Sequence, residues 1–165
     1  MPADDVYFMR VFARSPHTPS PQEIASHLSG HHFEVRVVVE PPSLGVPYQG
    51  STGWDHLRLF YADGRAPLEL ERQSLHGDEP LPDRLRELMD ATADARDKRA
   101  RQRILDFLAE ASQVFELSIP PDFDWNAGRH LVSTELLNYL EKETEGMIQA
   151  DEEGYYQNNR SVLKL

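Results

Sequence analysis

Apolar residues recur along the chain with two different periods, and these periods predict which segments are strands and which are helices. Residues 33–40 alternate apolar and mostly polar side chains, which indicates a strand with one buried face. Residues 6–13 carry apolar side chains on both faces, which is typical of a central strand covered on both sides. Leu136, Leu137 and Leu140 recur at helical spacing and predict an amphipathic helix.

Applied to the whole chain, these patterns predict an α+β fold with a mostly antiparallel sheet or sheets, about three or four helices, and the order βαβββ-α-β-α-βββ. Strands are expected at 6–13, 33–40, 54–61, 68–72, 114–119, 147–150, 154–157 and 162–165. Helices are expected from 21 to 30, within 83–111 as one helix or two, and from about 132 to 145. The 165 residues are expected to form a single unit, and the pattern leaves open two packed lobes, 1–80 and 81–165.

Local signals sharpen some of these boundaries. Ser20, followed by a proline and then by Glu23, has the spacing of a capping box at the start of a helix. Ser133 or Thr134 is expected to cap the helix near 132, because a side-chain oxygen can accept a backbone N–H of the first turn.

Turn signals also cluster near the end of the printed sequence. Gly146 is expected just after a helix, in a left-handed conformation that costs glycine little. Residues 151–154 are expected to form a turn, and the Asn158-Asn159 pair predicts a tight hairpin between the last two strands.

Composition and charge exclude several classes of function. The chain has no cysteine, which excludes disulfides, thiol catalysis and thiolate metal sites. The start of the chain is acidic, unlike a signal peptide, and the apolar run at 37–39 is too short to span a membrane, so we expect a cytoplasmic protein. Arginine supplies 14 of the 17 basic residues, a bias that we interpret as bacterial.

The net charge of −11 is concentrated in the second part of the chain. Residues 104–165 contain 12 acids and 4 bases, net −8, whereas residues 1–103 contain 16 acids and 13 bases, net −3. Such a charge disfavours nucleic acid and favours a basic protein partner. The candidate partner-binding acids are Glu141, Glu143, Glu145, Asp151, Glu152 and Glu153. The plainer interpretation of these acids is a solvated helix face and a polar turn.

Trp125 is a further candidate for partner binding, because it lies in a polar loop between two aspartates. The alternative is that its ring folds back over the edge of the core. The basic run at 96–103 is expected to be a solvated helical segment, with pairing to the acidic residues or contact with phosphates as alternatives.

No set of residues indicates a catalytic or metal site, so no metal and no cofactor is expected. His27 and His31 are four residues apart, but Gly30 is expected to end the helix between them and to break the one-face geometry of a helical zinc pair. The glycine-containing loop at 45–53 lacks both a nucleophile elbow and a phosphate-loop lysine.

These observations favour a non-enzymatic protein-binding module, of immunity, antitoxin or regulatory type, that acts through an acidic C-terminal face. The alternative is a small-molecule-binding protein or enzyme with a site near Trp54, His56 and the loop from Gly45 to Gly53. The sequence makes no prediction of the oligomeric state.

Overall fold

The strands and helices follow one another in the predicted order in the computed structural model, which describes residues 6–40, 54–75, 80–125 and 131–165. In these ranges the strands are β1 (Tyr7–Ala13), β2 (Arg36–Val39), β3 (His56–Phe60), β4 (Leu68–Ser74), β5 (Gln113–Ile119), β6 (Gly146–Ala150), β7 (Gly154–Gln157) and β8 (Arg160–Lys164). The helices are α1 (Pro21–Gly30), α2 (Asp83–Ala93), α3 (Lys98–Glu110) and α4 (Val132–Glu143). The predicted α+β fold class is therefore confirmed.

All eight strands belong to one antiparallel sheet with the order β2-β3-β4-β5-β1-β6-β7-β8. β2-β3-β4 and β6-β7-β8 are each a meander of consecutive antiparallel strands, and β1 lies between β5 and β6. A strand from the beginning of the chain thus pairs on both sides with strands that come more than a hundred residues later.

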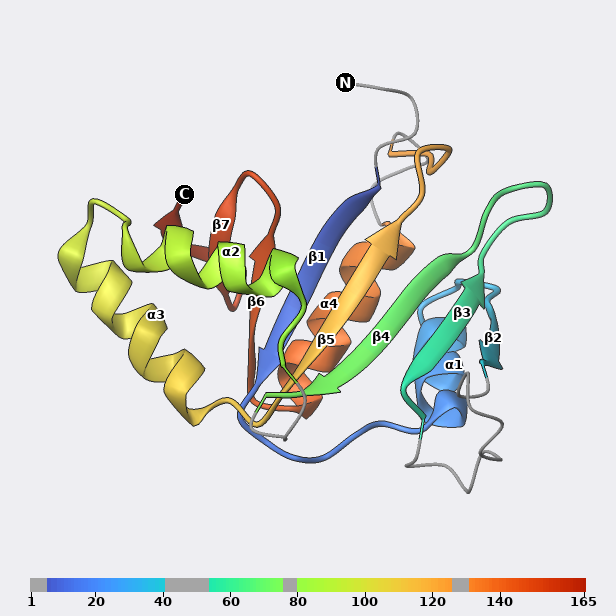
Figure 1. The fold of residues 1–165 in the computed structure, drawn as a ribbon. Coiled ribbons are helices and arrows are strands. Elements are labelled where there is room, and N and C mark those ends of the chain that lie inside the picture. The colour runs from blue at the N-terminus through green and yellow to red at the C-terminus, as the bar shows by residue number, and fades with distance from the viewer. Residues whose placement is uncertain (1–5, 41–53, 76–79, 126–130) are drawn as a thin grey trace.

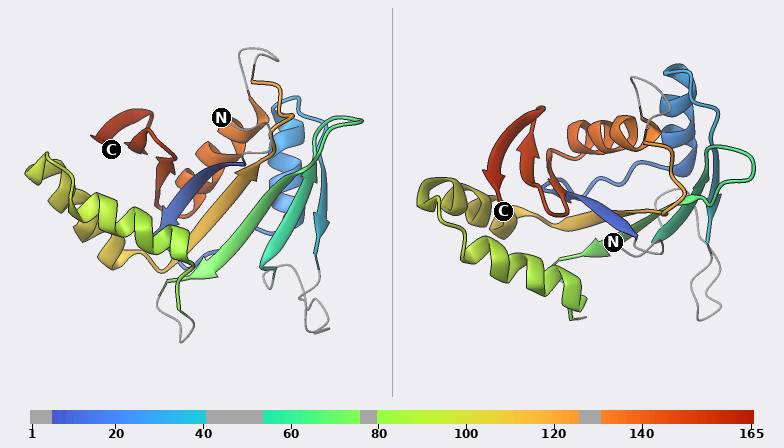
Figure 2. Two further views of the ribbon diagram at one scale, coloured as in Figure 1. Left: turned by 45° about the horizontal axis from the view of Figure 1, so that its top comes forward. Right: turned by 90° about the horizontal axis from the view of Figure 1, so that it is seen from above.

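Helices cover both faces of this sheet. Figure 2 shows α1 and α4 on one face and α2 and α3 on the other. The central strand β1 sends Val11 and Ala13 into the core beneath α1 and α4, and Phe12 into the core beneath α2 and α3. This arrangement explains why residues 6–13 are apolar on both faces (Figure 1). No helix in the described ranges has the length and apolar character needed to cross a membrane.

Two of the predicted helix boundaries have different outcomes. The capping box before α1 is confirmed, because the Ser20 side chain accepts from the backbone N–H of Glu23 at 3.1 Å and Glu23 reaches back to the Ser20 N–H. The predicted cap of α4 at Ser133 or Thr134 is wrong, since Leu131 occupies that position without a side-chain cap. Leu131 and Val132 pack against the core, so apolar packing decides where α4 begins.

The segment at 83–111 forms two helices rather than one. Asp94 ends α2, and the side chain of Asp97 caps α3 by accepting from the backbone N–H of Ala100 at 3.0 Å. The polar middle of the segment is therefore a break between helices, where each helix can turn its own apolar stripe to the sheet.

Of the predictions for the turns near the end of the chain, one is confirmed and one is wrong. Asn158 and Asn159 both have positive φ, 51° and 65°, as the predicted two-residue hairpin requires. Gly146, by contrast, is the first residue of β6, and the left-handed conformation falls on Glu145, with φ of 51°. A Cβ at position 146 would lie 2.6 Å from Cγ1 of Val11, so a close approach between β6 and β1 is what requires this glycine.

We expect Gly146→Ala to lower the free energy of unfolding by about 1–3 kcal/mol, because the added methyl group must push apart two central strands. The measurement is urea unfolding followed by circular dichroism. Gly30→Ala is the matched control, since a Cβ there meets nothing within 4 Å and the residue ends a helix. Gly30→Ala is expected to leave stability unchanged or slightly raised, and equal effects of the two substitutions would contradict the close approach.

Candidate protein-binding surface

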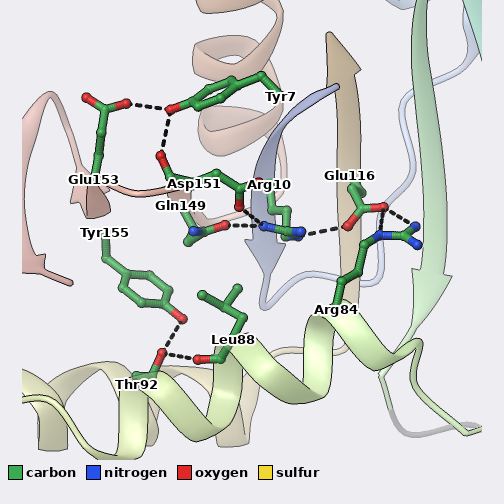
Figure 3. A network of polar contacts seen from close by, with 10 residues as sticks. All are labelled: Tyr7, Arg10, Arg84, Leu88, Thr92, Glu116, Gln149, Asp151, Glu153 and Tyr155. Atoms are coloured by element: carbon green, nitrogen blue, oxygen red, sulfur yellow. Dashed lines mark hydrogen bonds and ion pairs between the residues drawn. The ribbon is translucent and has the colours of Figure 1, made fainter. Parts of the chain in front are cut away.

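A fully buried arginine lies in the middle of the sheet. Arg10 on β1 is directly opposite Glu116 of β5 and Gln149 of β6. Its Nε donates to Glu116 at 2.8 Å, and its Nη1 donates to Gln149 at 2.7 Å and to Asp151 at 2.8 Å (Figure 3). A buried charge requires such partners, because desolvation would otherwise make it very unfavourable.

Arg10 is not among the candidate residues predicted from the sequence. A usable signal was present, because Arg10 is the one charged residue in an otherwise apolar strand at 6–13. A charged residue in a central strand is buried between its two neighbouring strands. It therefore indicates that carboxylates or amides lie opposite it on those strands.

The carboxylate of Glu116 also binds helix α2. Arg84 of α2 reaches Glu116, with its Nε at 2.8 Å from the carboxylate, and this hydrogen bond raises the pKa of the Arg84 guanidinium. The guanidinium carbons of Arg10 and Arg84 lie 5.5 and 5.1 Å from the ring centroid of Phe8. Charge and cation–π contacts therefore fix the start of α2 on the sheet beside β1.

Arg10 also fixes the acidic turn at 151–153, which follows β6. Besides its bond to Arg10, Asp151 donates its backbone N–H to Phe8 O at 3.1 Å. The Tyr7 hydroxyl lies 2.9 Å from the backbone oxygen of Asp151 and 2.7 Å from the carboxylate of Glu153. Burial raises the pKa of Tyr7 most, and the hydrogen bond to Glu153 raises it further. The Tyr7 hydroxyl therefore stays protonated and can donate to these oxygens.

Trp125 lies at the same end of the sheet. Its ring meets Tyr7 edge-on, with 5.6 Å between the ring centroids, and Phe123 edge-on at 4.9 Å. Phe123 is buried, whereas 45% of Trp125 is exposed. The loop that carries both is tied to the β3–β4 turn by Asp122, whose carboxylate accepts from the backbone N–H of Ala66 at 3.1 Å. Trp125 therefore rests on the core edge with one side and faces solvent with the other.

Two of the predicted partner-binding elements thus converge on Tyr7. We call Tyr7, Trp125, Glu152 and Glu153 the Tyr7 surface. Glu152 is exposed, in the left-handed conformation with φ of 62°. In the network behind them, Glu116 and Asp151 pair with Arg10 and Arg84, whereas no ion pair of the described residues includes Glu152 or Glu153. The surface combines a held aromatic ring with unneutralised negative charge.

The predicted partner-binding acids Glu143 and Glu145 lie away from the Tyr7 surface. Glu143 and Glu145 are exposed but come before β6, whereas the turn at 151–153 follows it. Because β6 has five residues, the two groups are separated by roughly 17 Å along the strand. The structure therefore does not gather the acids at 141–153 into one continuous patch.

Glu141 is buried, so the interpretation of the acids as a solvated helix face is wrong for this residue. Only 8% of the residue is exposed, and its carboxylate accepts a long hydrogen bond, 3.4 Å, from the backbone N–H of Asn158. The hairpin turn between β7 and β8 closes over this position, which the helical pattern of α4 alone does not reveal. Burial raises the pKa of the Glu141 carboxyl.

Of the predicted alternative ligand site, the structure describes Trp54 and His56. Trp54 is wholly buried, packs against Phe115 and donates its Nε1–H to Pro19 O at 2.8 Å, so its ring belongs to the core. His56 is half-buried, with its Nε2 at 3.2 Å from the carboxylate of Glu69. The loop from Gly45 to Gly53 lies outside the described residues.

A cavity of about 290 Å³ lies instead beside Tyr61, Phe33 and Phe123. The Tyr61 hydroxyl is buried and has no hydrogen-bond partner among the described residues. The volume is at the lower end of those that hold small molecules. Trp54 does not line this cavity.

The basic run at 96–103 covers the break before α3 and the first turns of that helix. Arg101 donates to Ala95 O at 3.2 Å and Arg103 to Gln157 at 2.8 Å. Among the ion pairs of the described ranges, none joins this run to the acids at 141–153. The prediction of a solvated basic segment fits this placement better than the alternative of pairing with those acids.

We expect Arg10→Met to lower the free energy of unfolding by about 3–5 kcal/mol, because the buried oxygens of Gln149 and Glu116 lose a donor that methionine cannot replace. Arg14→Met is the control, since Arg14 is 43% exposed and its ion pair with Glu110 is long, 3.7 Å. That substitution is expected to change stability by less than about 1 kcal/mol. Urea unfolding measures both, and a small effect at Arg10 would contradict the central role of its network.

Glu141→Gln is expected to stabilise the protein at neutral pH. The folded-state pKa of Glu141 is raised above its ordinary value of 4.5, so the folded state binds more protons and its stability falls as the pH rises through this range. The stabilisation by glutamine should therefore be larger at pH 7 than near pH 4.5. Unfolding of both proteins across this range measures the difference. Glu143→Gln, at an exposed position of the same helix, is the matched control, and an equal effect of the two substitutions would contradict a role for the burial of Glu141.

Comparison of the chain with known protein families, curated proteins and solved structures found no match.

Proposed function

We propose that the protein is a non-enzymatic binding module that holds a basic protein partner at the Tyr7 surface. The observation that carries the proposal is the half-exposed ring of Trp125, held edge-on by Tyr7 while the Tyr7 hydroxyl is held by the acidic turn. An aromatic ring and carboxylates are thereby presented side by side on a supported base.

The contacts that hold these side chains favour binding, because ordering flexible side chains costs free energy when two proteins associate. A binding residue that is already fixed loses little entropy when the partner arrives. Trp125 is fixed by two edge-on aromatic contacts, and the turn that carries Glu152 and Glu153 is fixed by Arg10 and Tyr7. Buried or half-buried tryptophans are common among the residues that dominate binding energy at protein interfaces.

The charge of the surface indicates the chemistry of the partner. An arginine or lysine of the partner can lie over the Trp125 ring and at the same time meet a carboxylate of Glu152 or Glu153. The overall charge of −11 would add attraction at longer range and speed the encounter with a basic protein. A bacterial cytoplasmic setting and an immunity, antitoxin or regulatory role remain the finer form of this proposal.

The test is capture of a partner by immobilised protein from a lysate of the cells that produce it, with each captured protein then purified and its Kd measured. A partner at the Tyr7 surface should be basic, and its association rate should fall as salt rises. Trp125→Ala should weaken Kd by about thirtyfold or more, which corresponds to about 2 kcal/mol, and Glu152→Lys should slow association.

The double variant Glu143→Lys, Glu145→Lys is the matched control, because it reverses two exposed charges at the other end of β6. Binding that survives this change but not Trp125→Ala supports the proposal. Binding that is lost with Glu143 and Glu145 and kept in Trp125→Ala would place the partner on the end of α4 instead, and would overturn the assignment to the Tyr7 surface.

A further inference from the structure

Three side chains with metal-binding atoms meet where the end of α1 lies against the start of α4. The Nε2 atoms of His27 and His31 lie 2.8 and 3.4 Å from the same carboxylate oxygen of Glu135. One nitrogen or oxygen from each residue lies within 4.8 Å of those of the other two. In the described ranges this is the one group of three such residues that could hold a metal ion.

The expectation that Gly30 breaks the one-face geometry of the two histidines is wrong. α1 does end at Gly30, and His31 is the cap residue that directly follows it, with φ of −102° and ψ of 21°, outside the helical region. Its backbone N–H still bonds to Leu28 O, and the His27 and His31 ring centroids lie 4.5 Å apart. The four-residue spacing therefore keeps both rings on one side of the helix end, as in helical zinc sites.

The surroundings hold these side chains in place before any ion arrives. The ring of His27 stacks on Tyr139 of α4, with 4.1 Å between centroids and 19° between planes. Glu135 stands one turn before Tyr139 on the same helix, so one face of α4 supplies both the carboxylate and the ring that orients His27. The side chains of His27 and Glu135 are only 25% and 21% exposed.

The spacing and the chemistry of these atoms fit a transition metal. Zinc bound by imidazole and carboxylate at about 2.0–2.2 Å in a tetrahedron separates its ligand atoms by about 3.3 Å. The His31–Glu135 distance of 3.4 Å matches this separation, and the His27–Glu135 distance of 2.8 Å requires an opening of about half an ångström. Two imidazoles and one carboxylate suit zinc and its neighbours in the first transition row rather than calcium or magnesium, which prefer oxygen.

We propose that His27, His31 and Glu135 form a binding site for a divalent transition-metal ion, with Zn²⁺ as the representative ion. The three residues leave one tetrahedral position for water or for a ligand atom of another molecule. Because His31 is 52% exposed, that position is reachable from solvent. The ion would join α1 to α4 across 108 residues of sequence, and the site is independent of the Tyr7 surface.

The test is a calorimetric titration of the full chain, without an affinity tag, with Zn²⁺. The expected result is one bound ion per chain in the wild type. His31→Ala and Glu135→Gln should each weaken binding by at least about tenfold, since loss even of an outer-shell partner has that effect. His32→Ala is the matched control, because His32 is exposed, adjoins the site and is not among its ligands, and its binding should equal that of the wild type.

Two further measurements make the outcome decisive. Zn²⁺ should raise the Tm of the wild type and of His32→Ala but not of Glu135→Gln, because an ion that binds only the folded state stabilises it. Co²⁺ in place of Zn²⁺ should give the visible absorption of a four-coordinate ion in the wild type. His31→Ala and Glu135→Gln should not show this absorption. Absence of stoichiometric binding, or binding that persists in both ligand variants, would overturn the proposal.

Discussion

The buried positive charge of Arg10 is the constraint on which most of the structure depends. An unpaired guanidinium in the middle of a sheet would be prohibitively unfavourable, so every element around Arg10 is arranged to satisfy it. β5 supplies Glu116, β6 and the turn after it supply Gln149 and Asp151, and α2 approaches because Arg84 shares the carboxylate of Glu116. The outer residues of the Tyr7 surface are held in place at the end of this chain of contacts.

Such a network favours one register as well as one fold. A shift of β1 by one residue relative to β5 or β6 would turn Arg10 to the opposite face, where α1 and α4 cover an apolar core. Apolar alternation alone specifies this register weakly in β1, because both of its faces are apolar. The charge therefore supplies the specificity that the hydrophobic pattern of the strand lacks.

Much of the architecture could be predicted from local patterns, because those patterns depend on the backbone a few residues away. The capping box at Ser20 and the hairpin at Asn158 are of this kind, and both were predicted. What could not be predicted depends on segments distant in sequence. Glu141 is buried by a hairpin that follows it, Gly146 is required by a strand near the start of the chain, and the histidine pair becomes a candidate site only through Glu135, about a hundred residues later.

The two proposed sites were likewise predictable only in part, because local patterns revealed single residues and the fold brought those residues together. Trp125 and the acidic turn were visible in the sequence as candidates, but only the structure shows that both contact Tyr7. The pair of histidines was also visible, and the helix-cap geometry of His31 together with the position of α4 turns a dismissed pattern into a specific arrangement of three ligands.

The central place of β1 has a consequence for how the chain reaches its fold. Its partners Glu116 and Gln149 lie 106 and 139 residues further along, so the sheet cannot close until β6 has been made. Contacts over such distances slow folding and leave apolar strand edges uncovered in the meantime. Until β6 emerges, the arginine of β1 keeps that strand partly hydrated and gives it a charge that discourages pairing with other nascent chains. The group that organises the finished sheet is thus also suited to protect its most vulnerable strand before the sheet exists.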